Sequence, residues 1–175
     1  EAAKRLIALH AELLKTGPVP ELNLGGGFGV AYTEQDKPAQ IEEIAYAITE
    51  TVEAECKKRG IEVPALAFEP GRYIVGPTGI TIYNVGTTKD VTVEETASRK
   101  YVSIDGGMSD NARPALYQAE YSAMIASRVT SATPALARVV GKHCESGDIV
   151  VRHDYLPSDI SVNDVLAVAA TGAYC

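Results

Sequence analysis

A carboxylate and a guanidinium stand three residues apart at the end of an apolar run. Residues 65–68 have the length and composition of a buried strand, and Glu69-Pro70-Gly71-Arg72 follows directly. Pro70 has no N–H to donate and Gly71 tolerates positive φ, so the chain must turn here. In α/β barrels the catalytic side chains lie at the carboxyl ends of parallel strands. The turn predicts that Glu69 and Arg72 point into one cavity; the alternative is a strand-to-loop junction with a surface ion pair.

A glycine-rich run is the second candidate for chemistry. Gly25, Gly26 and Gly27 follow a short predicted strand at 20–24. Backbone N–H groups of residues without Cβ can approach an anion closely, and phosphate is the usual one. The dinucleotide fingerprint G-x-G-x-x-G fails, because Val30 stands where the third glycine would be. A phosphate cradle and a plain structural turn are equally open at this point.

Arg113 and Tyr117 lie four residues apart in the segment 111–117, after a predicted turn at 105–110. If the segment is helical, both side chains share one face and together could bind a carboxylate. A surface arginine packed on a tyrosine is the equally open alternative.

A thiol lies beside a carboxylate at Cys144-Glu145, in the glycine-flanked segment 141–148. A buried, inert thiol is the default interpretation of such a cysteine. An exposed thiol near Lys142 and His143 could instead donate or accept a proton.

The elements that position these residues change in character along the chain. Residues 1–15 and 38–59 have helical apolar spacing, and Cys56 on the second stripe is predicted to be a core residue. Helix, strand, glycine loop, helix and strand in that order predict β/α units of a parallel sheet. Beyond Arg72 the pattern becomes all-β, with a domain change near residues 76–80. The predicted strands there are 80–85, 101–104, 137–140, 148–151 and 165–169.

Composition excludes several classes of partner. The formal net charge of −7 argues against nucleic acid and anionic membranes. No apolar run approaches the roughly 20 residues of a membrane span, and no signal peptide is recognisable. Three widely spaced cysteines show no metal-ligand pattern and indicate reduced thiols in the cytoplasm.

The chain opens without Met inside a helical pattern and closes directly after a strand, so a fragment of a longer protein is expected.

Five runs together resemble one family, in order and from end to end: GGGFG, FEPGR, DGGMSDNARPALY, GKHCESGD and the final TGAY. They resemble the diaminopimelate decarboxylases, pyridoxal-phosphate enzymes of the alanine-racemase-like fold class that form lysine and CO₂ from meso-2,6-diaminopimelate. The resemblance implies an α/β-plus-all-β chain. Residues 1–78 would be the last part of a pyridoxal-phosphate-binding (β/α)8 TIM barrel. Residues 79–175 would be an antiparallel β-barrel or sandwich domain, incomplete at its C-terminus.

The resemblance also implies a role for each candidate residue. Pyridoxal 5′-phosphate would be held by Gly25, Gly26, Gly27, Glu69, Pro70, Gly71, Arg72 and Tyr174, with Glu69 facing the pyridine nitrogen. An amino-acid substrate would be bound by Arg72, Arg113, Tyr117, Glu145 and Tyr174. Cys144 would be the proton donor, and with Glu145 it would enter the partner subunit's site in a homodimer with shared active sites. No metal is implied.

Three alternatives can be weighed against this resemblance. Relatives acting on ornithine usually carry Asp after the cysteine and lack an arginine like Arg113, so an ornithine- or arginine-type decarboxylase is less favoured. A non-catalytic binding relative would not need Cys144, Glu69 and Arg72 together, and a racemase of this fold would not need Cys144-Glu145. The family's Schiff-base lysine is expected upstream of residue 1, so these 175 residues alone are expected to be inactive.

Overall fold

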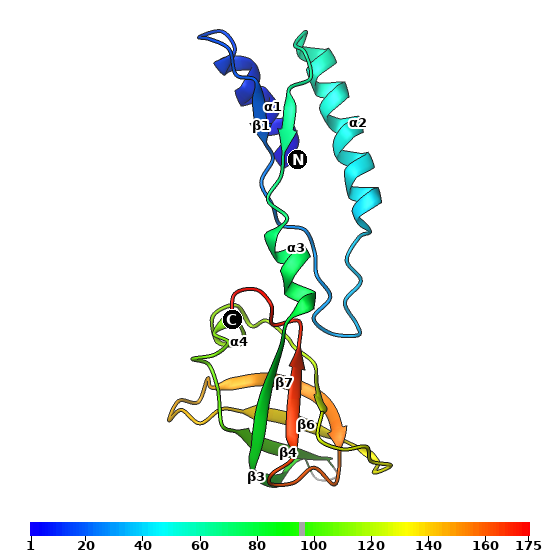
Figure 1. Ribbon diagram of the computed structural model, residues 1–175, viewed down its shortest axis with the longest axis vertical. Coiled ribbons are helices and arrows are strands. Elements are labelled where there is room, and N and C mark those ends of the chain that lie inside the picture. Colours follow the sequence, from blue (N-terminus) through cyan, green and yellow to red (C-terminus); the bar gives the residue numbers. More distant parts are fainter. Residues whose placement is uncertain (95–96) are drawn as a thin grey trace. The chain divides into compact units, whose positions relative to one another are not determined.

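The computed structural model describes residues 1–94 and 97–175 (Figure 1). Its internal contacts divide the chain into two compact units, residues 1–29 with 37–73 and residues 30–36 with 74–175. The second unit is therefore discontinuous in sequence, because the segment 30–36 packs with residues that come much later. A division of the protein into domains at residues 78 and 79 stays a prediction.

The first unit has the predicted alternation of helices and strands. Its elements are α1 (Ala2–Leu13), β1 (Glu21–Asn23), α2 (Ile41–Arg59) and β2 (Ala65–Ala67), and α3 (Gly71–Val75) begins at its end. Strands β1 and β2 pair in parallel, with Leu22 opposite Leu66. Ile7 of α1 packs with Val52 and Cys56 of α2 in a small core. Cys56 is 1% exposed, which confirms that it is a core residue.

The second unit is a six-stranded sheet. Its strands are β3 (Ile80–Glu94), β4 (Ala97–Ile104), β5 (Ala123–Ile125), β6 (Pro134–Val140), β7 (Ile149–Pro157) and β8 (Val165–Ala169), in the order β5-β8-β3-β4-β6-β7. A short 3₁₀ helix η1 (Gly76–Thr78) precedes β3, and α4 (Arg113–Tyr117) lies between β4 and β5. The Ala123 N–H donates to Asp154 Oδ2 at 2.8 Å and so links the two outermost strands, β5 and β7. The sheet is therefore mostly closed on itself.

One strand pairing departs from the expected antiparallel domain. Strands β4 and β6 pair in parallel, with Val102 opposite Val139, whereas the other pairings among the described strands of this six-stranded sheet are antiparallel. A parallel pair needs a long crossover between its strands. The chain between β4 and β6 supplies one, since it includes α4 and β5. The sheet is mixed for this reason.

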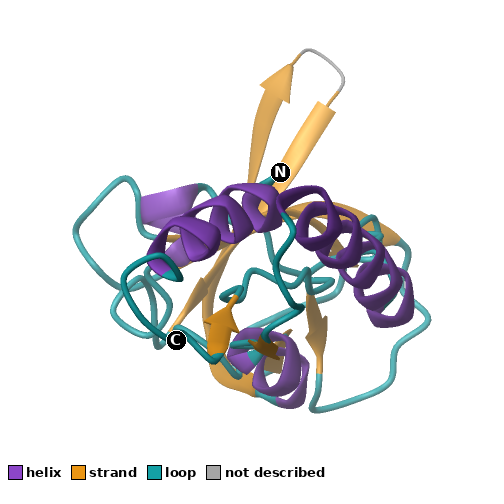
Figure 2. Cartoon of the chain, turned by 90° about the horizontal axis from the view of Figure 1, so that it is seen from above, coloured by secondary structure: helices purple, strands orange, loops and turns teal. Residues whose placement is uncertain are grey.

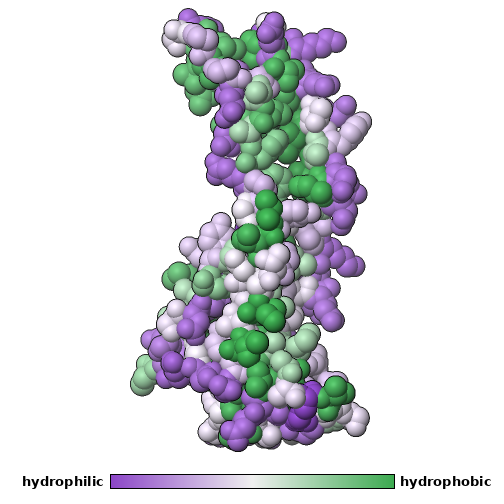
Figure 3. Space-filling model, viewed as in Figure 1, coloured by the Kyte–Doolittle hydropathy of each residue, from purple (hydrophilic) through white to green (hydrophobic). Residues whose placement is uncertain are grey.

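Apolar side chains fill the inside of this sheet and also occur on its surface. Val102, Val139, Val151, Leu166 and Val168 are completely or almost completely buried. Figure 2 shows the outer part of the β3–β4 pair extending away from the rest of the sheet. Figure 3 shows hydrophobic patches on the visible face of the molecule. No helix within residues 1–94 and 97–175 is both long and apolar enough to cross a membrane.

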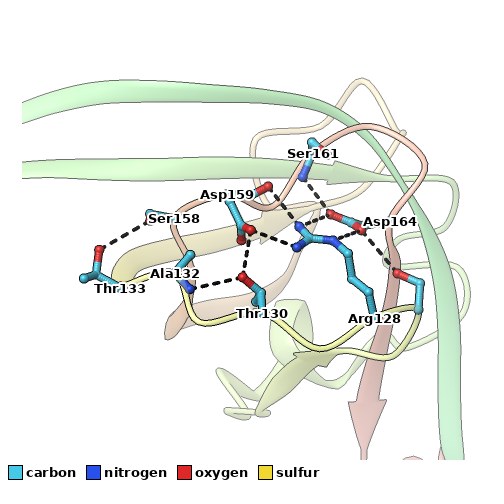
Figure 4. Close-up of polar contacts among 9 residues, drawn as sticks. Arg128, Thr130, Ala132, Thr133, Ser158, Asp159, Ser161 and Asp164 are labelled. Carbon is cyan, nitrogen blue, oxygen red and sulfur yellow. Dashed lines mark hydrogen bonds and ion pairs between the residues drawn. The ribbon is translucent and has the colours of Figure 1, made fainter.

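A polar network fastens two loops of the second unit to each other (Figure 4). Arg128, in the loop between β5 and β6, donates from Nε to Asp164 Oδ1 at 2.7 Å and from Nη1 to Asp159 Oδ2 at 2.8 Å. Both carboxylates belong to the loop between β7 and β8, and Thr130 also donates to Asp159. The hydrogen bonds from Arg128 lower the pKa of Asp164 to about 2. The network joins the loop between β5 and β6 to the loop between β7 and β8. It includes none of the candidate site residues named from the sequence.

Candidate functional site

Glu69 lies against the glycine loop at the carboxyl ends of β1 and β2. Asn23, the last residue of β1, donates from Nδ2 to Glu69 Oε1 at 2.8 Å and accepts from the Gly25 N–H at 2.7 Å. The Glu69 N–H in turn donates to the Gly25 carbonyl at 2.9 Å. The parallel pairing of the two strands thus brings both predicted loops together, and Asn23 orients the Glu69 carboxylate.

The loop after β1 requires glycine at each of its three positions. Gly25 and Gly27 have φ of 78° and 89°, in the left-handed region that side chains rarely adopt. A Cβ on Gly26 would collide with the Glu69 carbonyl oxygen. A hollow of about 160 Å³ lies beside this loop, lined by its backbone and by Ile44, Ile48 and Phe68 among others. Bare backbone around a hollow suits an anionic group such as a phosphate.

Arg72 is engaged with the glycine segment and not with Glu69. It lies on α3, where its Nη2 donates to the Phe28 carbonyl at 3.3 Å. The described part of the chain contains no ion pair between Glu69 and Arg72, so the interpretation as a surface ion pair is wrong. Neither residue lines the hollow beside the loop. Pro70 lies in the connection between β2 and α3, whereas Gly71 is the first residue of α3 and does not adopt the positive φ that glycine allows.

Arg113, Tyr117 and Tyr174 surround one cavity of the second unit. The predicted helix exists as α4, which begins at Arg113 and ends at Tyr117. A cavity of about 490 Å³ is lined by both of these residues, by Ala112 and Leu116, and by Tyr174 near the other end of the unit's sequence. Tyr117 and Tyr174 are 73% and 72% exposed. The site thus presents two phenols and one guanidinium to a small molecule.

The Arg113 guanidinium is held by another tyrosine. Its Nη1 donates to the Tyr121 hydroxyl at 2.7 Å. Burial is the largest single influence and lowers the pKa of Arg113, but the hydrogen bond to Tyr121 and the other influences of Tyr121 and Tyr32 together outweigh it, so the net pKa lies above that of a free guanidinium. Arg113 is therefore a permanent cation at this cavity.

Cys144 and Glu145 lie on an exposed loop between β6 and β7. Cys144 is an exposed free thiol, so the interpretation as a buried, inert cysteine is wrong. Glu145 accepts from the Gly147 N–H at 3.1 Å and from Ser146 Oγ at 3.2 Å. Neither residue lines the cavity around Arg113. Both are accessible to a reactant or to another subunit.

One buried carboxylate joins the Cys144 loop to the turn that leads into α4. Asp148 is 3% exposed and accepts from the His143 N–H at 2.7 Å and from the Met108 N–H at 2.6 Å. A Cβ on either Gly107 or Gly141 would collide with this carboxylate, so both glycines are required for its approach. We refer to these contacts as the Asp148 tie.

Three of these positioning residues were not foreseen from the sequence. Asn23 ends a strand at the edge where Glu69 also lies, a placement that could have identified it. Asp148 gave no such signal because its partner Met108 lies 40 residues away in sequence. Tyr121 gave none because an irregular segment after α4 separates it from Arg113.

Comparison with known proteins identifies two matching families. Residues 1–76 match the family described as "Pyridoxal-dependent decarboxylase, pyridoxal binding domain". Residues 42–172 match "Pyridoxal-dependent decarboxylase, C-terminal sheet domain".

Individual relatives agree with these matches. The chain is 50% identical to diaminopimelate decarboxylase of Corynebacterium efficiens over 99% of its length, covering 38% of that protein. It is 51% identical to the enzyme of Mycobacterium tuberculosis, again over 99% of the chain and 40% of the relative. The crystal structure of diaminopimelate decarboxylase from M. jannaschii in complex with L-lysine superimposes with a TM-score of 0.83 at 32% identity, over 99% of this chain and 38% of that one.

The chain thus spans about two fifths of the length of the relatives it matches. Its β/α unit and its mixed sheet correspond to the two matched families, and the match to the sheet-domain family alone covers most of the 175 residues. The chain belongs to the pyridoxal-dependent decarboxylases.

Proposed function

We propose that the protein carrying this chain removes CO₂ from meso-2,6-diaminopimelate to form L-lysine. The observation that carries the proposal is the cation Arg113 at a cavity shared with Tyr117 and Tyr174. A substrate with two amino-acid ends needs a group that binds the carboxylate of the end that does not react, and a guanidinium suits it. Relatives about 50% identical over nearly the whole chain are diaminopimelate decarboxylases, which supports the same substrate.

The residues of the first unit fit pyridoxal phosphate. We assign the cofactor phosphate to the backbone of Gly25–Gly27 and to Gly71-Arg72, since the loop presents bare backbone and accepts only glycine, through positive φ at Gly25 and Gly27 and lack of room at Gly26. Glu69 holds a proton on the pyridine nitrogen, and Asn23 keeps its carboxylate in place through the 2.8 Å bond. When bound, the cofactor acts as an electron sink for the bond that breaks. Pro70, and Tyr174 of the second unit, complete the proposed cofactor contacts.

Apart from Arg72, the residues that bind the substrate and supply the proton belong to the second unit. Arg113 and Tyr117 hold the distal carboxylate, with Arg72 and Tyr174 as further substrate contacts, and Glu145 binds the distal amine. After CO₂ leaves, Cys144 donates a proton to the substrate Cα. Exposure of Cys144 and Glu145 on one loop supports their entry into the partner subunit's site in a homodimer. We place this soluble homodimer in the cytoplasm, with the barrel ending near residue 78.

A substrate panel tests the proposal directly. The full-length protein is purified with pyridoxal phosphate and supplied separately with meso-2,6-diaminopimelate, L-ornithine and L-arginine, and CO₂ and amine products are measured. We expect CO₂ and L-lysine from diaminopimelate only. Turnover of ornithine or arginine in preference to diaminopimelate would overturn the proposal in favour of the related decarboxylases. Arg113→Met is the matched variant, and it should raise KM for diaminopimelate.

A further inference from the structure

Arg113 is enclosed by two phenols that do not line the cavity. Besides its hydrogen bond to the Tyr121 hydroxyl, its guanidinium carbon lies 4.6 Å from the centre of the Tyr32 ring and 5.8 Å from that of Tyr121. The two rings also contact each other, edge to face, with centres 5.1 Å apart and an interplanar angle of 70°. We call Tyr32 and Tyr121 the phenol bracket.

The phenol bracket is less exposed to solvent than the phenols of the cavity itself. Tyr121 is 1% exposed, whereas Tyr117 and Tyr174 are largely exposed. Burial raises the pKa of Tyr121, so its hydroxyl stays protonated and neutral at physiological pH. The bracket therefore holds Arg113 by stacking and by one hydrogen bond without neutralising its charge.

Among the residues that the structure describes, the charge of Arg113 has no anionic partner. Within residues 1–94 and 97–175, no carboxylate forms an ion pair with it. A guanidinium has five N–H donors in a fixed planar fork. One donor is bound by Tyr121 and one face lies over the Tyr32 ring, so other donors are left for an anion in the cavity.

We propose that the phenol bracket positions Arg113 and thereby determines the preference of the site for a carboxylate-bearing ligand over a diamine. The inference rests on the proposed function, because it takes Arg113 to bind the distal carboxylate. A guanidinium held in advance loses less side-chain entropy when it binds, which favours ligands that use it. Tyr32 and Tyr121 are positioning residues and touch no substrate themselves.

L-lysine and cadaverine form the ligand pair that tests the bracket. They share the amine and the carbon chain, but only L-lysine has a carboxylate for Arg113. Dissociation constants of both ligands are measured by calorimetry on the full-length holoenzyme, wild type and variants. We expect Tyr121→Phe to weaken L-lysine binding about tenfold, as expected for one lost charge-assisted hydrogen bond, and to leave cadaverine binding unchanged.

Tyr32→Phe is the matched control. Tyr32→Phe keeps the stacked ring and removes only a buried hydroxyl that has no hydrogen-bond partner in the described part of the chain, so it should change the L-lysine dissociation constant far less than Tyr32→Leu does. Tyr32→Leu removes the stacked ring and should weaken the binding of L-lysine but not that of cadaverine. This variant is used for the test if Tyr121→Phe does not fold. An equal change for both ligands, or no change in either Tyr121→Phe or Tyr32→Leu, would overturn the inference.

If the proposed function itself is wrong, the wild-type measurements will show it. If the wild-type protein binds L-lysine no more tightly than cadaverine, or does not decarboxylate diaminopimelate, the assignment of Arg113 or of the substrate is wrong. If wild type discriminates and Tyr121→Phe discriminates equally well, only the role of the bracket is wrong.

Discussion

Replacing Asp148 by asparagine tests whether one carboxylate holds two functional loops. The wild-type carboxylate accepts two short bonds from backbone N–H groups, one in each loop, and is almost fully buried. Asp148→Asn has nearly the same shape but only one acceptor oxygen. Its NH₂ group would face a backbone N–H, donor against donor.

The expected size of the effect follows from these two bonds. A hydrogen bond to a charged acceptor contributes about 1.5–3 kcal/mol, and the substitution removes one and weakens the other. We therefore expect the free energy of opening the loops to fall by about 2–3 kcal/mol. The equilibrium constant for opening then rises roughly 30- to 150-fold. Because the loops lead to Arg113 and carry Cys144, kcat should fall as well.

Hydrogen exchange followed by mass spectrometry measures the opening directly. Peptides that contain Met108 and His143 should lose protection in Asp148→Asn by the factor given above. Asp105→Asn is the matched control, because Asp105 also accepts two N–H bonds, both from Asn84, but is exposed. Unchanged protection in Asp148→Asn, or an equal loss in Asp105→Asn, would show that the Asp148 tie does not hold the loops.

Three further outcomes are expected. In the full-length protein, Glu69→Gln should keep the cofactor bound, as seen by absorbance, but lower kcat by about two orders of magnitude. Cys144→Ala should lower kcat with much less effect on KM, while Cys56→Ala should cost on the order of 1 kcal/mol of stability and leave kcat unchanged in steady-state assays. The pKa of Asp164 is lowered when folded, so its contribution to stability is present above about pH 4 and is lost as the pH falls toward 2. Thermal unfolding of Asp164→Asn should lack this part of the pH dependence, and an unchanged profile would contradict the assignment.

The sequence predicted those elements whose signals are local. Apolar periodicity located α1 and α2 to within a few residues, and the β-rich runs located β3, β4, β6, β7 and β8. It missed β5, which is only three residues long, and α3, because Pro70-Gly71 was interpreted as a turn alone. The parallel pairing of β4 with β6 depends on a crossover between distant segments, for which the strands themselves carry no signal.

The residues of the candidate site likewise fall into those with a local sequence signal and those without one. Glu69, Gly25–Gly27 and Arg113 could be named as candidates because residue type and the end of an element coincide in the sequence. Tyr32 and Asp148 could not, since each acts through contacts with residues many positions away. Sequence patterns therefore suggest candidate ligand-contacting groups more readily than the groups that hold those candidates in place.

The placement of segment 30–36 has a consequence for recombination between relatives. Tyr32 belongs to the second unit although the chain passes through most of the first unit before it reaches Arg113. A chimaera joined at residue 74 would take Tyr32 from one parent and Arg113 with Tyr121 from the other. Such hybrids inherit the cation and its stacking partner from different lineages, so the unit of exchange in this family should begin at or before residue 30.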